Sequence, residues 1–462
     1  MIDKYYNGVI EQVVSGIGNV EHNSILVRYS NDFSIWDLES VNHYKDQTDI
    51  FFTCHEFSYN KIAEAYEPYL GLIRQMFHKY CSGTLEEFME ECDVYKLQRP
   101  VFESYFEKGF CERTEQILID EVEYEQERMR NSIVTMLQKL SEIRPVVIVL
   151  NRFQLASKST MQLTNRLLQT KNKNIGIVLG VNDVQSIPEF AHEEWDAICE
   201  SMDDRNMVYH IGNAGRNMEP DVMDYYSDYE SDDGYRKLNN LVYFLDFDQA
   251  DHHLSKIERR IKFDNFTISE KKHYQLLLLQ IMVSVLQRDI AKALESCEDL
   301  EKLQDQEKEG AFYYNFWMAT SYMYLGKLEE AMIYVQKAKE CGEALGDDFL
   351  VFRAELLKAQ NQMSGWCNIF FCAQDIEISD KLIEKLNAYD YKNHLAHIYI
   401  YAYDNKPEIV AKAYRSEAFL IYFSKGVALA KEIGNEQLIS IAYRKNIMIA
   451  STNGEYEVSL LY

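Results

Sequence analysis

The chain has 462 residues, too many for one hydrophobic core, and its 47% hydrophobic and 26% charged residues are typical of folded domains. Its formal net charge of −26 argues against the lysine- and arginine-driven binding of nucleic acids or of anionic membranes. The sequence has neither an apolar run long enough to span a bilayer nor the apolar core of a signal peptide. Its nine scattered cysteines lack metal-ligand spacing, which indicates reduced thiols in a cytoplasmic protein.

Residues 1–215 alternate short apolar runs with stretches of helical periodicity. The runs VVIVL and IGIVLG are β-branched, as in strands buried on both faces of a parallel sheet. The pattern predicts an α/β domain. Its expected strands are Val9–Ser15, Asp49–Cys54, Val146–Leu150 and Ile175–Gly180. Its clearest expected helices are Glu123–Ser141 and Thr160–Thr170.

An acidic segment follows at residues 216–237, where Glu219–Gly234 reads EPDVMDYYSDYESDDG. Asp228, Glu230 and Asp232 alternate as in a calcium loop, but the turn glycine comes one residue late and no bidentate glutamate follows. We therefore expect a solvated linker or loop.

Residues 238–462 are predicted to be helical hairpin repeats. In Asn315–Lys339, the small residues Ala319, Ala331 and Ala338 would let two antiparallel helices approach closely, and Gly326 would end the first of them. This unit resembles a tetratricopeptide (TPR) hairpin.

Looser units have a period near 40 residues. Ala293 precedes Ala331 by 38 residues, with Arg288 where a turn glycine would stand. Further turn signals are Gly346, Gly365, Gly434 and the NGEY sequence at Asn453–Tyr456. About five such hairpins would stack into a curved solenoid that binds a protein or peptide.

The chain ends within an expected hairpin. Val458, Leu460 and Leu461 would begin its second helix, whereas a solenoid normally ends in a polar capping helix. We therefore expect the sequence to be a piece of a longer regulator.

A second pattern lies at Val13–Leu26, which reads VVSGIGNVEHNSIL. A phosphate-binding P-loop, G-x-x-x-x-G-K-[ST], follows a strand, and its backbone N–H groups, lysine and hydroxyl hold the phosphates and Mg²⁺. Gly16 takes the first glycine position, with Gly18 two residues on. The second glycine, the lysine and the hydroxyl are replaced by Glu21, His22 and Asn23.

The segment Arg144–Leu168 reads RPVVIVLNRFQLASKSTMQLTNRLL. It resembles the STAND family, AAA-related signal-transduction ATPases in which a hydrophobic strand precedes D-D-x-Q-W-A-D-x-S-T-L. Ile175–Asp183 resembles the family's sensor strand, and Cys54–Ile73 resembles the segment after its second strand. The resemblance covers the N-terminal domain, and helical repeats often follow that domain in the family. The matching positions of the motif are Gln154, Ala156, Ser159 and Thr160.

The departures from the family concern its chemistry. Asn151 and Arg152 stand at the acidic pair that, in the family, coordinates Mg²⁺ through water and polarises the attacking water, and Ser157 stands at the third acidic position. The resemblance therefore implies a pseudo-ATPase and not an enzyme. ATP or ADP binding without hydrolysis stays open, but we expect no cofactor. The degenerate nucleotide site would comprise Gly16, Gly18, His22, Asn23 and Asn151.

His394 and His397 lie three residues apart on a predicted helix without a third ligand at a matching offset, so we expect no metal site. The expected function is a non-catalytic signalling regulator or scaffold that binds a protein or peptide. Relatives alternate between closed and open oligomeric forms, so the resemblance allows a homo-oligomer. One alternative is an NTP-dependent STAND switch with unusual ligands. The other is a fragment of a bacterial DNA-binding transcription activator whose output domain is absent here.

Overall fold

A computed structural model of the chain divides into two compact units. The sheet unit comprises Met1–Val94, Gln98–Leu118 and Glu125–Phe266, and the hairpin unit comprises Tyr95–Leu97, Ile119–Tyr124 and Thr267–Tyr462. The residues that the structure describes are 2–19, 23–29, 34–45, 49–58, 61–111, 122–170, 172–182, 187, 189–203, 207–211, 229, 231–264, 266–364, 380–401, 417–452, 454 and 457. Within these ranges, no helix combines the length and the apolar character needed to cross a membrane.

The sheet unit is built on a parallel five-stranded sheet in the order β2-β3-β4-β1-β5. The predicted α/β class is confirmed. Both β3 and β4 are buried along their whole length, as their β-branched sequences predicted. The strands are β1 (Ser24–Tyr29), β2 (Phe51–Glu56), β3 (Val146–Asn151), β4 (Ile175–Asn182) and β5 (Val208–Ile211).

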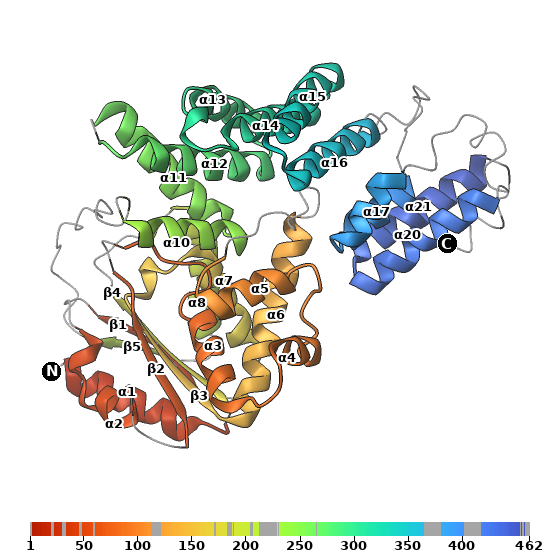
Figure 1. Ribbon diagram of the computed structural model, residues 1–462. Coiled ribbons are helices and arrows are strands. Elements are labelled where there is room, and N and C mark those ends of the chain that lie inside the picture. Colours follow the sequence, from red (N-terminus) through yellow and green to blue (C-terminus); the bar gives the residue numbers. More distant parts are fainter. Residues whose placement is uncertain are drawn as a thin grey trace. The chain divides into compact units, whose positions relative to one another are not determined.

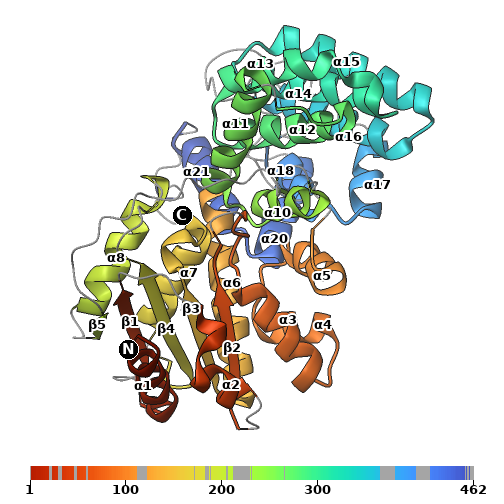
Figure 2. The ribbon, with the colours of Figure 1, turned by 90° about the vertical axis from the view of Figure 1, so that its left-hand side faces the viewer.

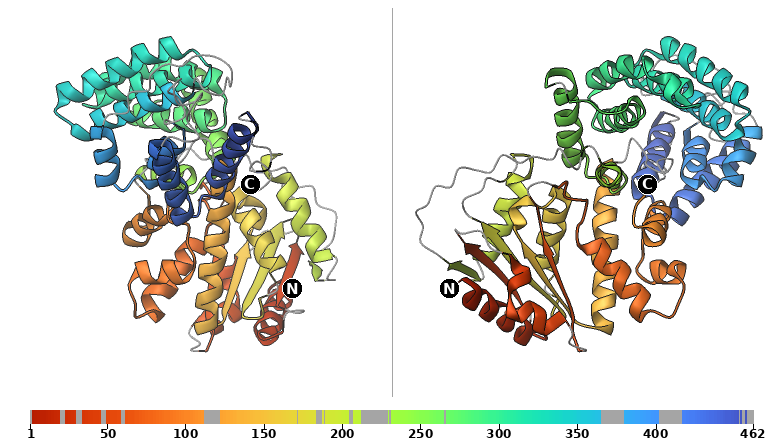
Figure 3. Two further views of the ribbon diagram at one scale, coloured as in Figure 1. Left: turned by 90° about the vertical axis from the view of Figure 1, so that its right-hand side faces the viewer. Right: turned by 60° about the vertical axis from the view of Figure 1, so that its left-hand side comes forward.

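Helices cover both faces of this sheet (Figure 3). On one face lie α1 (Ile2–Gly16) and α2 (Glu39–Lys45). On the other lie α6 (Val122–Ile143), α7 (Lys158–Gln169) and α8 (His192–Asp203), the first two of which match the predicted helices. The remaining helices of the unit are α3 (Tyr69–Tyr80), α4 (Leu85–Glu91), α5 (Arg99–Lys108), α10 (Asp232–Tyr243) and α11 (Phe247–Phe263), with 3-10 turns at Ile35–Asp37, Phe153–Leu155 and Glu189–Ala191.

The strand predicted at Val9–Ser15 is wrong, because this segment lies in α1. Tyr6, Val9, Ile10 and Val13 are all at most 5% exposed and recur at the spacing of one helical face, although several are β-branched. This face packs closely on β4, where a Cβ on Gly176 would lie 2.8 Å from Val13 Cγ1. Neither β1 nor β5 was predicted.

The hairpin unit consists of helices packed against their chain neighbours (Figures 1 and 2). The predicted hairpin at Asn315–Lys339 is confirmed: α14 and α15 pack through Ala319 and Ala331, which are fully buried. Farther along, Phe352, Leu386 and Ile398 join α16, α17 and α18 in one apolar cluster. The helices are α12 (Glu270–Leu286), α13 (Ile290–Glu301), α14 (Gly310–Tyr324), α15 (Leu328–Leu345), α16 (Asp348–Ser364), α17 (Asp380–Ala388), α18 (Lys392–Tyr401), α20 (Glu417–Ile433) and α21 (Glu436–Thr452), with a 3-10 turn at Gln304–Gln306.

The hairpins share one turn geometry. A single residue with positive φ follows the first helix, as at Gly326 with φ 71° and at Arg288 with φ 65°. The next N–H then donates to a carbonyl five residues earlier, which closes the end of the helix. These bonds are Asp246 N–Leu241 O (2.8 Å), Asp289 N–Ser284 O (2.8 Å), Lys327 N–Tyr322 O (2.9 Å), Tyr391 N–Leu386 O (2.8 Å) and Asn435 N–Ala430 O (2.9 Å). The α10–α11 pair is thus closed like the repeats.

The repeat region was expected to begin at residue 238, whereas the long segment of the hairpin unit begins at Thr267 and the α10–α11 hairpin belongs to the sheet unit. The expected linker at 216–237 ends in this hairpin, since Ser231 caps α10 by accepting from the Gly234 N–H at 2.8 Å. Most of the acidic segment lies outside the described residues. So do Gly365, Val458, Leu460, Leu461 and, in the NGEY sequence, all but Gly454, whose φ is 77°.

Candidate functional site at the carboxyl edge of the sheet

The structure does not bring the predicted nucleotide-site residues together. Gly16 ends α1, and the segment through Asn23 leads into the start of β1. The Gly18 N–H donates to Lys173 O at 2.8 Å, and Asn23 Nδ2 donates to Ile175 O at 2.9 Å, so Gly18 and Asn23 lie beside the start of β4. These residues therefore lie at the amino edge of the parallel sheet, whereas Asn151 ends β3 at the carboxyl edge.

This placement corrects the assignment of a P-loop to Gly16–Asn23. A P-loop runs from a strand into a helix, so that the N–H groups of the helix start face the phosphate. Here the chain runs from a helix into a strand. His22 lies outside the described residues.

The carboxyl edge is where a sheet of this topology binds ligands. From β1 the chain returns through α2 toward β2, whereas from β4 it returns through α8 toward β5, so the adjacent strands β1 and β4 connect in opposite directions. Such a switch point is the general location of sites in open parallel sheets. The strand ends there carry Tyr29, Glu56, Asn151 and Asn182.

The centre of this edge is filled by the protein's own polar groups. The Asn151 side chain is fully buried, and its Oδ1 accepts a hydrogen bond from the Tyr29 hydroxyl at 2.7 Å. A Cβ on Gly180 would collide with the Tyr6 hydroxyl and lie 2.6 Å from Asn151 Oδ1. Burial raises the pKa of Tyr6 well above its usual value, so its phenol stays neutral.

An ion pair lies beside this centre. Arg152 directly follows β3 with the left-handed φ of 53°, and its Nη1 lies 3.2 Å from Glu56 Oε1 at the end of β2. The other carboxylate oxygen, Oε2, accepts from the Ser34 hydroxyl at 3.1 Å and from the Ile35 N–H at 3.2 Å. The side chains of Glu56 and Arg152 are only 10% and 18% exposed. Glu56 therefore binds the Arg152 guanidinium and the Ser34 and Ile35 donors, which are the groups through which an anion would bind here.

The residues of this edge that the structure describes do not fit a Mg²⁺–nucleoside triphosphate. Such a ligand needs a hydroxyl and carboxylates for the metal, and a lysine and backbone N–H groups for the phosphates. Here Asn151 accepts a hydrogen bond from Tyr29. Arg152 forms an ion pair with Glu56, and the Ile35 N–H donates a hydrogen bond to Glu56. In the described part of the chain, no cluster of three or more His, Cys, Asp or Glu side chains has the arrangement of a metal site.

The amino end of α7, which follows β3, is also occupied by an internal carboxylate. The Ser159 N–H donates to Asp246 Oδ2 at 2.8 Å, and Asp246 Oδ1 accepts from the Gln249 N–H at 3.3 Å at the start of α11. Burial raises the pKa of Asp246, although these hydrogen bonds oppose the shift. Asp246 thus joins the first turns of α7 and α11.

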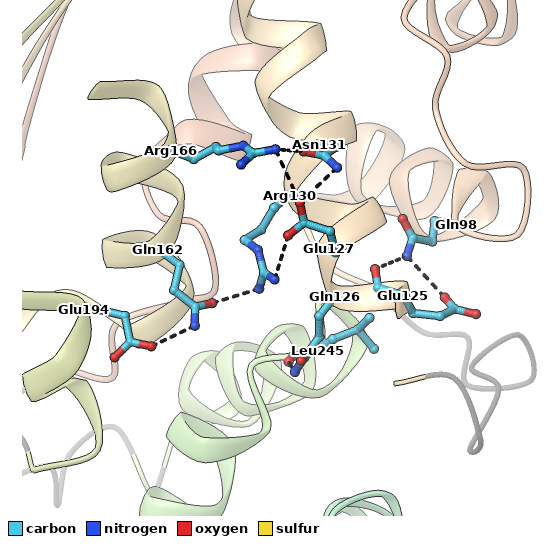
Figure 4. Close-up of polar contacts among 10 residues, drawn as sticks. All are labelled: Gln98, Glu125, Gln126, Glu127, Arg130, Asn131, Gln162, Arg166, Glu194 and Leu245. Carbon is cyan, nitrogen blue, oxygen red and sulfur yellow. Dashed lines mark hydrogen bonds and ion pairs between the residues drawn. The ribbon is translucent and has the colours of Figure 1, made fainter. Parts of the chain in front are cut away.

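A chain of polar side chains extends from here across the helical face (Figure 4). Arg130 of α6 pairs with Glu127 at 3.0 Å and donates to Gln162 Oε1 of α7 at 3.0 Å. Gln162 then donates to Glu194 Oε1 of α8 at 2.8 Å, and Lys158 links Glu194 (3.6 Å) to Asp248 of α11 (2.6 Å). The network connects α6, α7, α8 and α11 within the sheet unit.

A titratable cluster lies on the α3 side of β2. His55 Nε2 is 3.4 Å from Glu67 Oε1, the Glu64 N–H donates to Glu67 Oε2 at 3.1 Å, and Asn240 of α10 donates to Glu64 Oε2 at 2.8 Å. Burial, with the Glu67 charge second, raises the pKa of Glu64 to about 7. Burial lowers the pKa of His55 to about 4. Near neutral pH the imidazole is therefore uncharged.

In the hairpin unit, the aromatic side chains of α14 differ in burial. Trp317 is 8% exposed, whereas Phe316 and Tyr322 are only partly buried. Of the two histidines considered for a metal, His394 is partly buried, and its desolvation lowers its pKa to about 3. The described surface of the unit also carries exposed apolar side chains: Leu325, Ile333, Leu345, Tyr389 and Ile421.

Sequence reasoning missed Ser34, Glu56 and Asp246. The run SILVRY at Ser24–Tyr29 could have indicated Ser34. If this run is predicted as the first strand, the loop that follows the first strand lies just before Ile35. No local pattern indicated that Glu56 would reach that loop.

Taken together, the chain combines a parallel α/β sheet unit with a unit of helical hairpin repeats. No protein-family model and no curated protein matches the sequence. Among solved structures, the chain is similar to a signal transduction ATPase with numerous domains (STAND) protein with a tetratricopeptide repeat sensor from Pyrococcus horikoshii. The two are 12% identical, with a TM-score of 0.42, over 96% of this chain and 81% of that one.

Proposed function

We propose that the protein is a non-catalytic signalling regulator. In this proposal the sheet unit neither binds nor hydrolyses a nucleoside triphosphate, and the hairpin unit binds a protein or peptide. We also assign the protein to the cytoplasm, which cell fractionation would test.

The observation that carries the proposal is the Glu56 carboxylate, which is held by Arg152, Ser34 and Ile35 at the carboxyl edge. A phosphate group at this place would face that carboxylate. Two unit charges about 4 Å apart repel by about 1–4 kcal/mol over effective dielectric constants of about 80 to 20. With Asn151 and Arg152 in place of the acidic pair, the edge also has no carboxylate at the position that would polarise a water.

Equilibrium dialysis of the full chain with labelled ATP and ADP, with and without Mg²⁺, tests the nucleotide part. We expect no retention of either nucleotide up to about 1 mM, where binding is worth about 4 kcal/mol, and no release of phosphate. Arg152→Ala is the matched control, since any specific anion binding at this edge would fall in this variant. Micromolar binding or turnover by the wild type would establish a working NTP-dependent switch and reject the proposal.

Photo-crosslinking tests the partner part in the native cell. A benzoylphenylalanine at Ile333, which is 57% exposed on α15, would report a macromolecule bound to the hairpins, and the same group at Tyr209, 38% exposed on β5, is the control. We expect a discrete protein adduct from position 333 and none from position 209. Adducts from position 209 alone, or nucleic acid as the species joined at position 333, would contradict the proposed partner.

A further inference from the structure

A hollow of about 570 Å³ lies along β2, the strand that ends the sheet beside β3. The Phe51 ring points toward α3, 6.1 Å from that of Tyr80, whereas the Phe52 ring lies 5.6 Å from that of Tyr44 on α2. The hollow therefore lies along the outer edge of β2, with α2 on one face of the sheet and α3 on the other. We name it the β2 groove. Its lining residues are Lys45, Ile50, Phe51, Phe52, Gly71, Arg74, Gln75, His78, Lys79 and Tyr80.

The backbone of β2 is suited to a further strand. The Phe51 N–H donates to Pro145 O at 2.7 Å, and the Phe57 N–H donates to Asn151 O at 3.1 Å. Since alternate residues of a strand point their N–H groups to opposite sides, those of Phe52, Cys54 and Glu56 point away from β3. The described sheet has no strand beyond β2. All six β2 residues are partly exposed, whereas every residue of β3 is buried.

The charge of the groove is opposite to that of the chain. Lys45 lies on its α2 side, and Arg74 and Lys79 lie on its α3 side, together with His78. None of the described lining residues is Asp or Glu, although the chain has a net charge of −26. Arg74 is held in place by donating to the carbonyls of Phe106 (2.7 Å) and Glu107 (3.1 Å), which bind the guanidinium without a formal countercharge.

We propose that the β2 groove binds an extended acidic segment of a partner protein, which adds to the sheet as a strand beside β2. Main-chain hydrogen bonds to the outer edge of β2 would supply affinity, as in other cases of strand addition. Successive side chains of such a segment point to opposite faces, so its carboxylates would meet Lys45 on one side and Arg74 or Lys79 on the other. The six residues of β2 match a segment about 20 Å long.

Lysines also protect exposed strand edges from aggregation, and the experiment separates the two roles. A fluorescent peptide of repeated Glu-Glu-Val-Val, which presents carboxylates on both faces of a strand, is titrated into the full chain, and binding is read by anisotropy. We expect saturable binding that weakens at least about tenfold between about 50 mM and 500 mM salt, because the attraction is screened. The same peptide with Lys in place of Glu should not bind.

Two variants locate the binding. Lys45→Glu with Lys79→Glu should raise the Kd at least about tenfold, the factor that corresponds to 1.4 kcal/mol. The matched control, Lys308→Glu with Lys358→Glu, makes the same charge change on exposed lysines of the hairpin unit and should change the Kd less than about twofold. Phe52→Pro removes one outward N–H and should also abolish binding. Circular dichroism confirms that each variant is folded.

Several results would overturn the proposal. They are absence of peptide binding, equal weakening by the control pair, and equally tight binding of a short oligothymidylate. Self-association of the wild type that Phe52→Pro abolishes, without peptide binding, would show instead that a second copy of the chain occupies the edge.

Discussion

Arg152 provides the sharpest test of the carboxyl edge, because two opposing effects meet at one residue. It holds a left-handed backbone conformation, with φ 53° and ψ 41°, that is unfavourable for any residue except glycine. Its side chain also forms the ion pair with Glu56. Arg152→Ala removes the ion pair and keeps the backbone strain, whereas Arg152→Gly removes both.

The magnitudes follow from the exposure of the pair. Both side chains are less than a fifth exposed, so the ion pair is worth more than a surface pair, and its loss should cost about 1–3 kcal/mol. A left-handed conformation costs a non-glycine residue about 1–2 kcal/mol, part of which the greater freedom of unfolded glycine offsets. We therefore expect Arg152→Gly to be about 1 kcal/mol more stable than Arg152→Ala, and both to be less stable than the wild type.

Urea denaturation of the full chain, followed by hydrogen exchange in peptides from β3 and β4, measures the unfolding free energy of the sheet unit. Glu56→Gln retains an oxygen that accepts from Ser34 and Ile35 but removes the charge. In a double-mutant cycle with Arg152→Ala it should show a coupling of at least about 0.5 kcal/mol. Equal stability of the alanine and glycine variants would refute the strained backbone, and strict additivity in the cycle would refute the ion pair.

Three further predictions concern packing, pH dependence and the hairpin turns. Gly180→Ala should destabilise the sheet unit by about 1–3 kcal/mol, because the added Cβ would collide with Tyr6. Gly8→Ala, in the middle of α1 where no atom lies within 4 Å of an added Cβ, should stabilise the unit by about 0.5–1 kcal/mol. Thermal melts in which Gly180→Ala is the more stable variant would contradict the close packing at Gly180. Because the pKa of Glu64 is raised to about 7, its contribution to the free energy of unfolding should fall as pH rises from about 4.5 to 7. Because the pKa of His55 is lowered to about 4, its contribution should rise from about pH 4 to 6.5. In urea titrations across this range, Glu64→Gln should make the free energy of unfolding rise more steeply with pH, and His55→Gln should make it fall with pH. Parallel pH profiles for the two variants would show that neither pKa shift exists. Gly326→Ala should cost about 1 kcal/mol, because φ is 71° there while no atom lies within 4 Å of an added Cβ, and hydrogen exchange should increase in α14 and α15 alone.

Local sequence patterns were sufficient to predict the elements whose buried positions form a regular pattern of apolar or small residues along the chain. The runs at β3 and β4 could be identified because both faces of these strands are buried, so every position must be apolar or small. The α14–α15 hairpin was predictable for a related reason, since Ala319 and Ala331 must be small where the two helices touch. In α1, the same β-branched residues were misleading, because the period of their spacing and not their type determines which structure buries them.

The candidate site could not be read in this way. Glu56 and Arg152 stand at the ends of β2 and β3, far apart in the sequence, and they meet only because parallel pairing aligns those strand ends. The predicted nucleotide site combined Gly16, Gly18 and Asn23 at the amino edge of the sheet with Asn151 at the carboxyl edge, because the strand at Ser24–Tyr29 had not been recognised. The sequence by itself determined the two classes of structure and that Asn151 and Arg152, rather than carboxylates, stand at the end of β3. Only the tertiary structure decided that Glu56 meets Arg152, Ser34 and Ile35 at the carboxyl edge, because these contacts join residues distant in the chain.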